Sequence, residues 1–296
     1  MTSRSRVAPV TEQHVTDRRL AERPPAPDPL PVPVVDNHAH LDIRRDDAPE
    51  VELGQLVAEA AAVGVDRMVQ IGCDIGSARW TAGVLDQHPA LLGGVAIHPN
   101  EAPRHEQAGD LDDVIDEIAS LAQHPRIRVI GETGLDYYRT GPEGVAAQQE
   151  SFRRHIALAK DAGLALQVHD RDAHDDVLRI LAEEGAPERT VLHCYSGDMG
   201  MARECVRRGY FLSFAGTVTF RSAKDLRDAL AVTPMEHLLV ETDAPYLTPT
   251  PHRGRVNAPY LLPLTVRAMA ATLGTSVPEL CQALSDNSER VYGPWA

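Results

Sequence analysis

The sequence contains few lysines, no long apolar run and no closely paired cysteines, and each absence narrows the possible classes of protein. No apolar stretch approaches the roughly 18 residues that a membrane span requires. The first residues lack the apolar core of a secretory signal, and they include acidic side chains that transit peptides avoid. The four cysteines are widely separated, which is typical of reduced thiols rather than of a disulfide framework or a zinc ribbon. These features predict a cytoplasmic protein.

The charge balance excludes a broad basic surface for coating nucleic acid, because the net charge is −14 over 296 residues. Such a charge remains compatible with an enzyme that holds one or two phosphates through metal ions and a few arginines. Lysine occurs only twice, at Lys160 and Lys224, and both positions lie in segments with helical periodicity.

The chain divides at about residue 31. Residues 1–31 form an extension, in which the stretch 24–33 contains six prolines among ten residues. Proline at this density favours a polyproline II conformation and forbids a helix or a central strand. We therefore predict a flexible, disordered arm over 1–31, followed by a single domain over 32–296.

Within that domain, short apolar or β-branched runs alternate with longer segments of helical period, as in successive βα units. The predicted strands are 32–40, 66–72, 91–98, 127–134, 164–170, 190–194, 210–216 and 237–243. The predicted helices include 51–64, 111–123, 145–163 and 223–232, with two closing helices at 259–274 and 277–293. Eight strands with crossover helices predict an α/β (β/α)₈ TIM barrel. An open, doubly wound sheet is the alternative.

Side chains that can bind metal ions recur where the predicted strands end, which is where barrel enzymes place their active sites. These residues are His38, His40, His98, Glu132, His169, His193 and Asp243. Any one of them alone could be a hydrogen-bonded rim residue or a helix cap. Their joint occurrence at matching ends of different strands favours a metal centre.

These ligands are too many for one catalytic zinc ion, which keeps three protein ligands and an open position. They divide between two divalent ions, with Glu132 as the bridging carboxylate. His38, His40 and Asp243 would hold one ion, and His169 and His193 the other. A water activated by both ions would be the nucleophile, and Asp243 is the best candidate to receive its proton. Mg²⁺, Mn²⁺ and Zn²⁺ all remain possible.

An ordered series of motifs resembles the TatD family of metal-dependent deoxyribonucleases. The series consists of DNHAHLD, AIHPN, GETGLDYY, VHDRDAH, LHCYSG, ETDAPYLTPTPHRGRVNAP and DNSERVYG, and it covers about residues 34–293. The resemblance implies a TIM-barrel hydrolase that cleaves DNA, typically with Mg²⁺ and as a 3′-to-5′ exonuclease on single strands. It also implies that His38, His40, Glu132, His169, His193 and Asp243 are the metal ligands and that His98 lies near the substrate.

Two further positions have competing interpretations. In the segment after the last strand, we expect Arg253 to bind a substrate phosphate through its guanidinium, the alternative being a solvated loop. Cys194 adjoins His193, and strand alternation predicts that its thiol points away from the site and packs against a helix.

Other functions remain open at this stage. A second possibility is a dinuclear barrel hydrolase that cleaves lactones, amides or phosphotriesters. Many such enzymes bridge their metals with a carboxylated lysine on the fourth strand, where this sequence has Glu132. Cleavage of a tRNA ester is also compatible with the predicted site. A catalytically silent scaffold is disfavoured, because the ligand set is intact.

Overall fold

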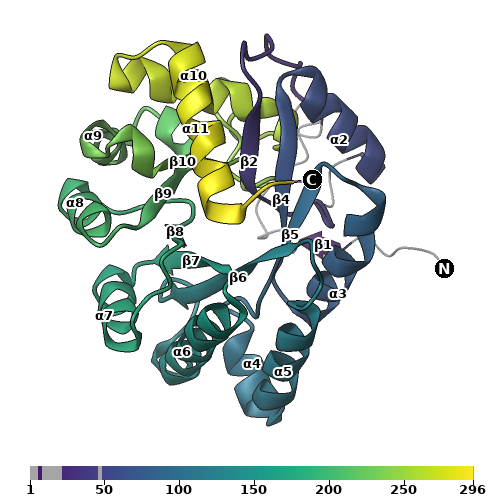
Figure 1. Ribbon diagram of the computed structural model, residues 1–296, viewed down its shortest axis with the longest axis vertical. Helices are drawn as coiled ribbons and strands as arrows, with labels where there is room; N and C mark the ends of the chain where they lie inside the picture. The colour runs from purple at the N-terminus through teal and green to yellow at the C-terminus, as the bar shows by residue number, and fades with distance from the viewer. Residues whose placement is uncertain (1–5, 9–21, 46–48, 296) are drawn as a thin grey trace.

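The computed structural model describes residues 6–8, 22–45 and 49–295, and most of them form one barrel of parallel strands surrounded by helices (Figure 1). The strands are β2 (Val34–Ala39), β4 (Val65–Gly72), β5 (Leu91–Val95), β6 (Ile127–Asp136), β7 (Ala165–Arg171), β8 (Thr190–Leu192), β9 (Phe211–Phe214) and β10 (Leu238–Val240). They follow one another in chain order around the sheet, and every neighbouring pair is parallel. The eight predicted strands and the TIM-type barrel are confirmed.

The first and last strands approach each other and nearly close the barrel. Ala39 forms an isolated parallel bridge with Ala244, just beyond β10. The His40 N–H donates to the Ala244 carbonyl at 2.8 Å, and the Asp243 N–H donates to the His38 carbonyl at 3.0 Å. This junction therefore brings His38, His40 and Asp243 together, although two hundred residues of chain separate them.

All the helices but the last lie outside the ring of strands, as Figure 1 shows. They are α2 (Leu53–Ala62), α3 (Ile75–Val84), α4 (Ala102–Ala108), α5 (Leu111–Leu121), α6 (Val145–Ala162), α7 (His174–Glu184), α8 (Met199–Arg207), α9 (Lys224–Val232), α10 (Leu262–Leu273) and α11 (Val277–Tyr292). The named helical predictions correspond to α2, α5, α6, α9, α10 and α11. Glycines stop several helices as expected: Gly163 caps α6 in a left-handed conformation, with φ of 62°.

Apolar side chains fill two separate regions of the barrel. The larger cluster packs the outer faces of the strands against the helices. The smaller cluster takes at least one residue from each of the eight strands and fills the barrel interior, together with Val291 and Tyr292 of α11. In Figure 1 α11 crosses the ring of strands. The Gln167 side chain of β7 donates to the Tyr292 hydroxyl at 2.8 Å, so α11 is joined to the interior of the barrel.

The prediction of a flexible arm over residues 1–31 does not hold for residues 22–31. Arg23 forms an ion pair with Glu59 of α2, with an N–O distance of 2.9 Å. Leu30 is 7% exposed and belongs to the larger apolar cluster. Proline prevents regular structure in this segment, yet it leaves side chains free to pack, and they anchor the segment to the barrel.

The rest of the extension is described only at β1 (Arg6–Ala8), which pairs in parallel with β3 (Ile43–Arg45). The expectation of a flexible arm for residues 1–5 and 9–21 lies outside the described residues. Among the helices of the described chain, none combines the length and the apolar character needed to cross a membrane.

Candidate metal centre

The seven residues predicted at strand ends come from six of the eight strands, and all seven form one cluster of direct contacts. His38 and His40 lie at the end of β2, Glu132 in β6, His169 in β7, and His193 directly after β8. His98 and Asp243 follow β5 and β10, and both contact members of this group. The side chains of His38, His40, Glu132 and His193 are at most 5% exposed.

The imidazoles of His38 and His40 both direct Nε2 toward the centre of the cluster. His38 Nδ1 lies 2.7 Å from Gln167 Oε1, and His40 Nδ1 lies 3.0 Å from the Ile71 carbonyl. Both partners are acceptors, because the Gln167 amide nitrogen is already donating to Asn37 and Tyr292. Each Nδ1 must therefore carry the proton, which leaves a lone pair on each Nε2. These two Nε2 atoms face each other at 3.2 Å.

Glu132 lies between two sets of histidines. Its Oε1 atom is 3.6 Å from His40 Nε2 and 3.8 Å from His38 Nε2. Its Oε2 atom is 2.7 Å from His193 Nε2 and 2.9 Å from His169 Nδ1. One carboxylate therefore contributes one oxygen to each half of the cluster.

Asp243 completes the half that contains His38 and His40. Its Oδ1 atom lies 3.3 Å from His40 Nε2 and 3.8 Å from His38 Nε2. The backbone at Asp243 is left-handed, with φ of 53°, a conformation that aspartate and asparagine tolerate better than most residues. The side chain is 14% exposed, so the Asp243 carboxylate is accessible from the barrel mouth.

Two buried carboxylates that were not predicted hold the histidines of the other half. Glu241 Oε1 lies 3.1 Å from His193 Nδ1, and Asp136 Oδ2 lies 3.4 Å from His169 Nε2. Glu241 is fully buried and Asp136 is 1% exposed. Glu241 accepts the outward N–H of His193, and such a contact fixes the ring of a metal-binding histidine and makes it a stronger ligand. The contact of Asp136 with His169 is an ion-pair contact only, since His169 Nε2 has no hydrogen-bond partner among the described residues.

The close approach of β6 and β7 also brings Glu132 and His169 together. Gly134 pairs with His169 in the sheet register. A Cβ atom at Gly134 would lie 2.1 Å from the His169 carbonyl oxygen, and φ there is 136°. Only glycine fits this position, which explains the second glycine of the GETG motif, Gly134.

The electrostatics of the cluster indicate a site for cations. Burial raises the pKa of Glu132, but His193, His98 and His169 together bring it well below its usual range. Burial lowers the pKa of His193, and the carboxylates of Glu132 and Glu241 outweigh that effect and raise it well above its usual value. Both shifts favour a positive charge between His193 Nε2 and Glu132 Oε2, which lie 2.7 Å apart.

The donor set fits divalent metal ions. His38, His40 and Glu132 present ligand atoms within 4.8 Å of one another. Burial lowers the pKa of His40, but Cys73, Asp243 and Glu132 outweigh that effect and raise it well above its usual value, so this half of the cluster also favours a positive charge between its ligand atoms. Nitrogen and carboxylate ligands in this mixture suit Zn²⁺ or Mn²⁺, and the carboxylates also suit Mg²⁺.

His98 differs from the other histidines in its tautomer. The Asn100 N–H donates to His98 Nδ1 at 3.0 Å, so Nδ1 is an acceptor and the proton lies on Nε2. Burial lowers the pKa of His98 to about 3, which keeps the ring neutral. Its Nε2–H lies 3.7 Å from Glu132 Oε2 and is directed into the cluster. His98 is therefore built as a hydrogen-bond donor, and its place near the substrate stays a prediction.

Arg253 shows no contact with this cluster among the described residues. Its side chain is exposed, and its guanidinium carbon lies 4.4 Å from the centroid of the Phe220 ring. The phosphate-binding role of Arg253 therefore stays a prediction.

The strand alternation that was used to place the Cys194 thiol does not apply. Strand β8 ends at Leu192, and Cys194 has a left-handed backbone with φ of 43°, so the alternation of side chains no longer applies. The thiol is not part of either apolar cluster. Burial, together with the nearby carboxylates of Asp243 and Glu241, raises its pKa well above the usual value.

Cys73, directly after β4, was not predicted to reach the site. Its sulfur lies 3.3 Å from Glu132 Oε1 and 3.4 Å from His40 Nδ1. It lies one residue beyond a predicted strand, at the barrel end where the other site residues gather. This position in the sequence could have identified Cys73 as a residue near the site.

A parallel barrel that gathers buried histidines and carboxylates at the carboxyl ends of its strands defines the class of metal-dependent barrel hydrolases. A family model described as TatD related DNase matches residues 35–293. An uncharacterized metal-dependent hydrolase of Mycobacterium tuberculosis, TatD, is 44% identical over 265 residues and aligns over 88% of this chain and 98% of its own. The chain belongs to the TatD family.

Further similar proteins agree with this assignment. The uncharacterized metal-dependent hydrolase YcfH of Escherichia coli is 35% identical over 261 residues, covering 88% of this chain and 95% of its own. Among solved structures, the TatD homologue YjjV of Escherichia coli superposes with a TM-score of 0.80 at 23% identity. That alignment covers 88% of this chain and 98% of YjjV, and it supports the fold.

Proposed function

We propose that the chain hydrolyses phosphodiester bonds of DNA and that it acts as a 3′-to-5′ exonuclease on single strands. The observation that carries this proposal is the position of Glu132, whose two oxygens face two separate sets of histidines. A shared carboxylate suits two divalent ions, with His38, His40 and Asp243 around one and His169 and His193 around the other. When bound, such ions polarise a phosphoryl oxygen and lower the pKa of a water molecule.

The residues of the chain have distinct roles in this proposal. Asp243 accepts a proton from the attacking water, because its carboxylate is partly exposed and lies within the cluster. His98 donates its Nε2–H to a phosphoryl oxygen, where the donor would stabilise charge in the transition state. Glu132 orients both halves of the site and remains ionised throughout.

The barrel mouth also has features that suit unpaired nucleotides. The large apolar side chains that are exposed among the described residues are Tyr138, Met199 and Tyr246, and each follows the end of a barrel strand. Tyr138 is 64% exposed, and the Arg171 guanidinium lies 3.9 Å from its ring centroid. Exposed aromatic rings stack on unpaired bases, and arginine binds the backbone beside them. These features support a single-stranded substrate.

The direct test is cleavage of a 5′-labelled single-stranded oligodeoxynucleotide by metal-loaded protein. We expect EDTA to abolish cleavage, added Mg²⁺ or Mn²⁺ to restore it, and products to shorten stepwise from the 3′ end. A duplex and an RNA of the same sequence should react more slowly. A Glu132→Ala variant purified in parallel controls for contaminating nucleases.

Two outcomes would contradict this proposal. Rapid hydrolysis of a lactone or an amide with no nuclease activity would indicate another dinuclear hydrolase. Binding of DNA without cleavage in any metal would indicate a scaffold that has lost catalysis.

A further inference from the structure

A stacked pair of side chains lies at the rim of the barrel mouth, next to the metal centre. Tyr138 follows β6 and is 64% exposed, and the guanidinium carbon of Arg171 lies 3.9 Å from the centroid of its ring. Arg171 is the last residue of β7 and follows the predicted ligand His169 by two positions, so both side chains lie on the same face of the strand. Two residues of a strand span about 7 Å, so Arg171 lies beside the metal centre and not within it.

The backbone fixes the position of this pair relative to His169. The Tyr137 N–H donates to the Arg171 carbonyl at 2.9 Å, which joins the ends of β6 and β7. Asp136 Oδ1 accepts from the Tyr138 N–H at 3.1 Å, while Oδ2 of the same carboxylate lies 3.4 Å from His169 Nε2. One buried carboxylate thus lies against a residue of the metal centre and holds the turn that carries Tyr138.

The guanidinium of Arg171 has no hydrogen bond or ion pair in the part of the chain that the structure describes, although carboxylates are abundant in a chain with a net charge of −14. Its one contact of this kind is with the ring of Tyr138. Burial and the carboxylate of Asp243 raise the pKa of the Cys194 thiol, and the charge of Arg171 opposes them, so the guanidinium lies within electrostatic reach of the site. An arginine with accessible donors at this place is suited to an anion bound beside the metal centre.

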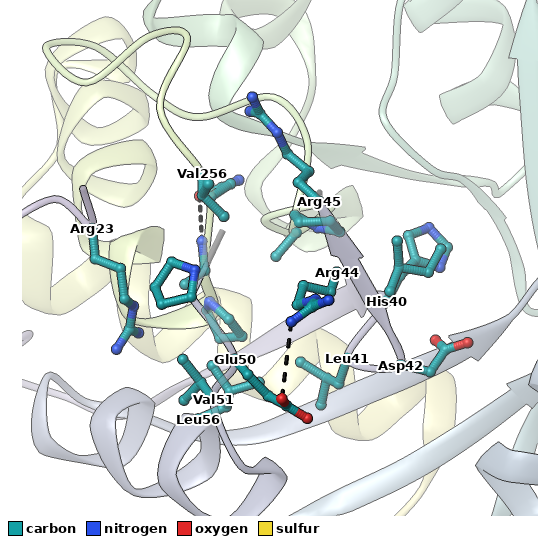
Figure 2. A pocket seen from close by; sticks show the side chains of 17 residues that line it. Arg23, His40, Leu41, Asp42, Arg44, Arg45, Glu50, Val51, Leu56 and Val256 are labelled. Carbon is teal, nitrogen blue, oxygen red and sulfur yellow. Dashed lines mark hydrogen bonds and ion pairs between the residues drawn. The ribbon is translucent and has the colours of Figure 1, made fainter. Parts of the chain in front are cut away.

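The cavity on the side of β2 is too small for a nucleotide. It adjoins His40 and lies between β3 and the start of α2 (Figure 2). Its volume is about 90 Å³, well below the roughly 300 Å³ at which small-molecule pockets begin. A strand bound at the metal centre therefore does not continue through this cavity.

The polarity of the proposed reaction decides which part of a strand meets Tyr138 and Arg171. Removal of a nucleotide from the 3′ end leaves one nucleotide on one side of the scissile phosphate and the whole remaining strand on the other. The terminal nucleotide carries only the scissile phosphate, whereas the remaining strand offers a base and a further phosphate at every step. An exposed ring with an arginine beside it matches that repeat, since aromatic rings stack on unpaired bases and arginine binds the backbone.

We propose that Tyr138 and Arg171 bind the strand on the 5′ side of the scissile phosphate. The open face of the Tyr138 ring stacks on the base of the penultimate nucleotide, and Arg171 binds the phosphate on the 5′ side of that nucleotide. The inference rests on the proposed function and specifies its substrate as a strand with a base and a phosphate upstream of the cleaved bond. Neither contact reads a base edge, so this site accepts every sequence.

Three dinucleotides that release the same 3′-terminal nucleotide test the two contacts separately. Thymidylyl-thymidine, TpT, has only the scissile phosphate; pTpT adds the upstream phosphate; and pSpT replaces the upstream nucleoside of pTpT by an abasic tetrahydrofuran residue. For the wild type we expect KM to be lower for pTpT than for either of the others. Arg171→Ala should remove the advantage of pTpT over TpT, which we expect to be on the order of tenfold, as for one charged hydrogen bond. Tyr138→Leu should remove its advantage over pSpT, which we expect to be at least about fivefold, as for one stacked base.

Arg104, whose side chain is 76% exposed on α4, provides the matched control Arg104→Ala. Thermal unfolding and metal content should be equal in all four proteins. Equal losses on all three dinucleotides in Arg171→Ala or in Tyr138→Leu, or no loss on any, would overturn the proposal. A fourth dinucleotide, pTpS, has the abasic residue at the 3′ end. If Tyr138→Leu removes the effect of that change instead, the ring holds the terminal nucleotide and the proposal is wrong.

A binding measurement separates this inference from the proposed function. Fluorescence anisotropy of a 5′-labelled hexathymidylate is measured with the metal-loaded Asp243→Asn protein, in which the proposed proton acceptor is removed so that the strand stays intact. Addition of Arg171→Ala or Tyr138→Leu to this protein should weaken binding by about the same factors as above, and addition of Arg104→Ala should not. Such weakening supports the site even if the wild type cleaves no DNA. Binding that neither substitution weakens, or no binding at all, shows that the assignment is wrong even if DNA is cleaved.

Discussion

Glu241 supports His193 from the side opposite the metal centre: its Oε1 atom lies 3.1 Å from His193 Nδ1. The other ring nitrogen of His193 lies 2.7 Å from Glu132 Oε2. Because Glu241 is completely buried, water does not weaken its influence on the ring. The pair fixes both the orientation and the tautomer of His193, which a metal ligand requires.

Glu241→Gln should therefore weaken metal binding while the hydrogen bond to His193 is kept. Loss of the buried charge makes the imidazole a poorer ligand, and the expected fall in affinity for one ion is about 10–100-fold. Calorimetric titration with Mn²⁺ measures this, and Glu236→Gln, at an exposed position just before β10, is the matched control. Unchanged affinity for both ions would remove Glu241 from the metal centre.

Glu132→Gln should weaken the binding of both ions together. The wild type is expected to hold close to two divalent ions per chain, since Glu132 directs one oxygen to each half of the cluster. His169→Asn is the comparison, because it should affect only the ion on its own side. Elemental analysis after dialysis gives the stoichiometry. Loss of a single ion in Glu132→Gln would show that this carboxylate is a ligand to one ion only.

Much of this architecture follows from periodicity in the sequence. Apolar or β-branched runs alternating with helical segments predicted all eight strands, and polar residues at the strand ends predicted the ring of candidate ligands. The reason is physical: the carboxyl ends of parallel strands meet at one mouth, so residues far apart in the chain converge there. His38 and Asp243 illustrate this convergence, because strand closure places the Asp243 N–H on the His38 carbonyl.

The supporting residues were missed, although alternation contained a signal for one of them. Gln167 precedes His169 by two residues within β7, so the two side chains lie on the same face of the strand. Glu241 lies beyond the end of β10, where alternation gives no such signal. Alternation failed at Cys194, where a left-handed residue follows the strand end. The contacts of residues 22–31 could not be predicted either, because proline-rich segments carry no periodicity that marks a packed face.

Asp243→Asn should lower hydrolysis by two orders of magnitude or more, since an amide cannot accept the proton of the attacking water. The fold should survive, because asparagine also tolerates the left-handed backbone at this position, where φ is 53°. Thermal unfolding checks the fold, and initial rates on bis(p-nitrophenyl) phosphate measure the loss. Near-parental rates would exclude Asp243 from the reaction.

His155, outside the metal centre, predicts how stability depends on pH. Its Nε2 accepts from the Ile97 N–H at 3.2 Å, and burial lowers its pKa to about 4. In the unfolded chain the imidazole of His155 binds a proton near pH 6.5. The stabilisation of the fold by the neutral ring is therefore complete above that pH and is lost as the pH falls toward 4. When the pH is lowered from 7 to 5, the free energy of unfolding should fall in both proteins. The fall should be about 2 kcal/mol smaller in His155→Gln than in the wild type. Urea denaturation measures this, and equal losses would contradict the prediction.

Arg253 tests substrate binding apart from metal chemistry. Its guanidinium stacks on Phe220 at 4.4 Å, and it lies on the segment that leaves Asp243 at the barrel mouth. Stacking holds the plane of the guanidinium and leaves its N–H groups able to bind a phosphate. Arg253→Ala should raise KM similarly for all single-stranded DNA sequences and reduce the salt dependence of binding by about 0.7 in the log–log slope, as one lost phosphate contact does.

Metal content should not change, and the loss on bis(p-nitrophenyl) phosphate should be much smaller than on an oligonucleotide. Arg104→Ala is the control, and a comparable rise in KM for that variant would reduce the effect to general surface charge. Equal losses on both substrates would mean that Arg253 stabilises the transition state or the folded structure. No loss on either substrate would mean that it is a solvated loop residue.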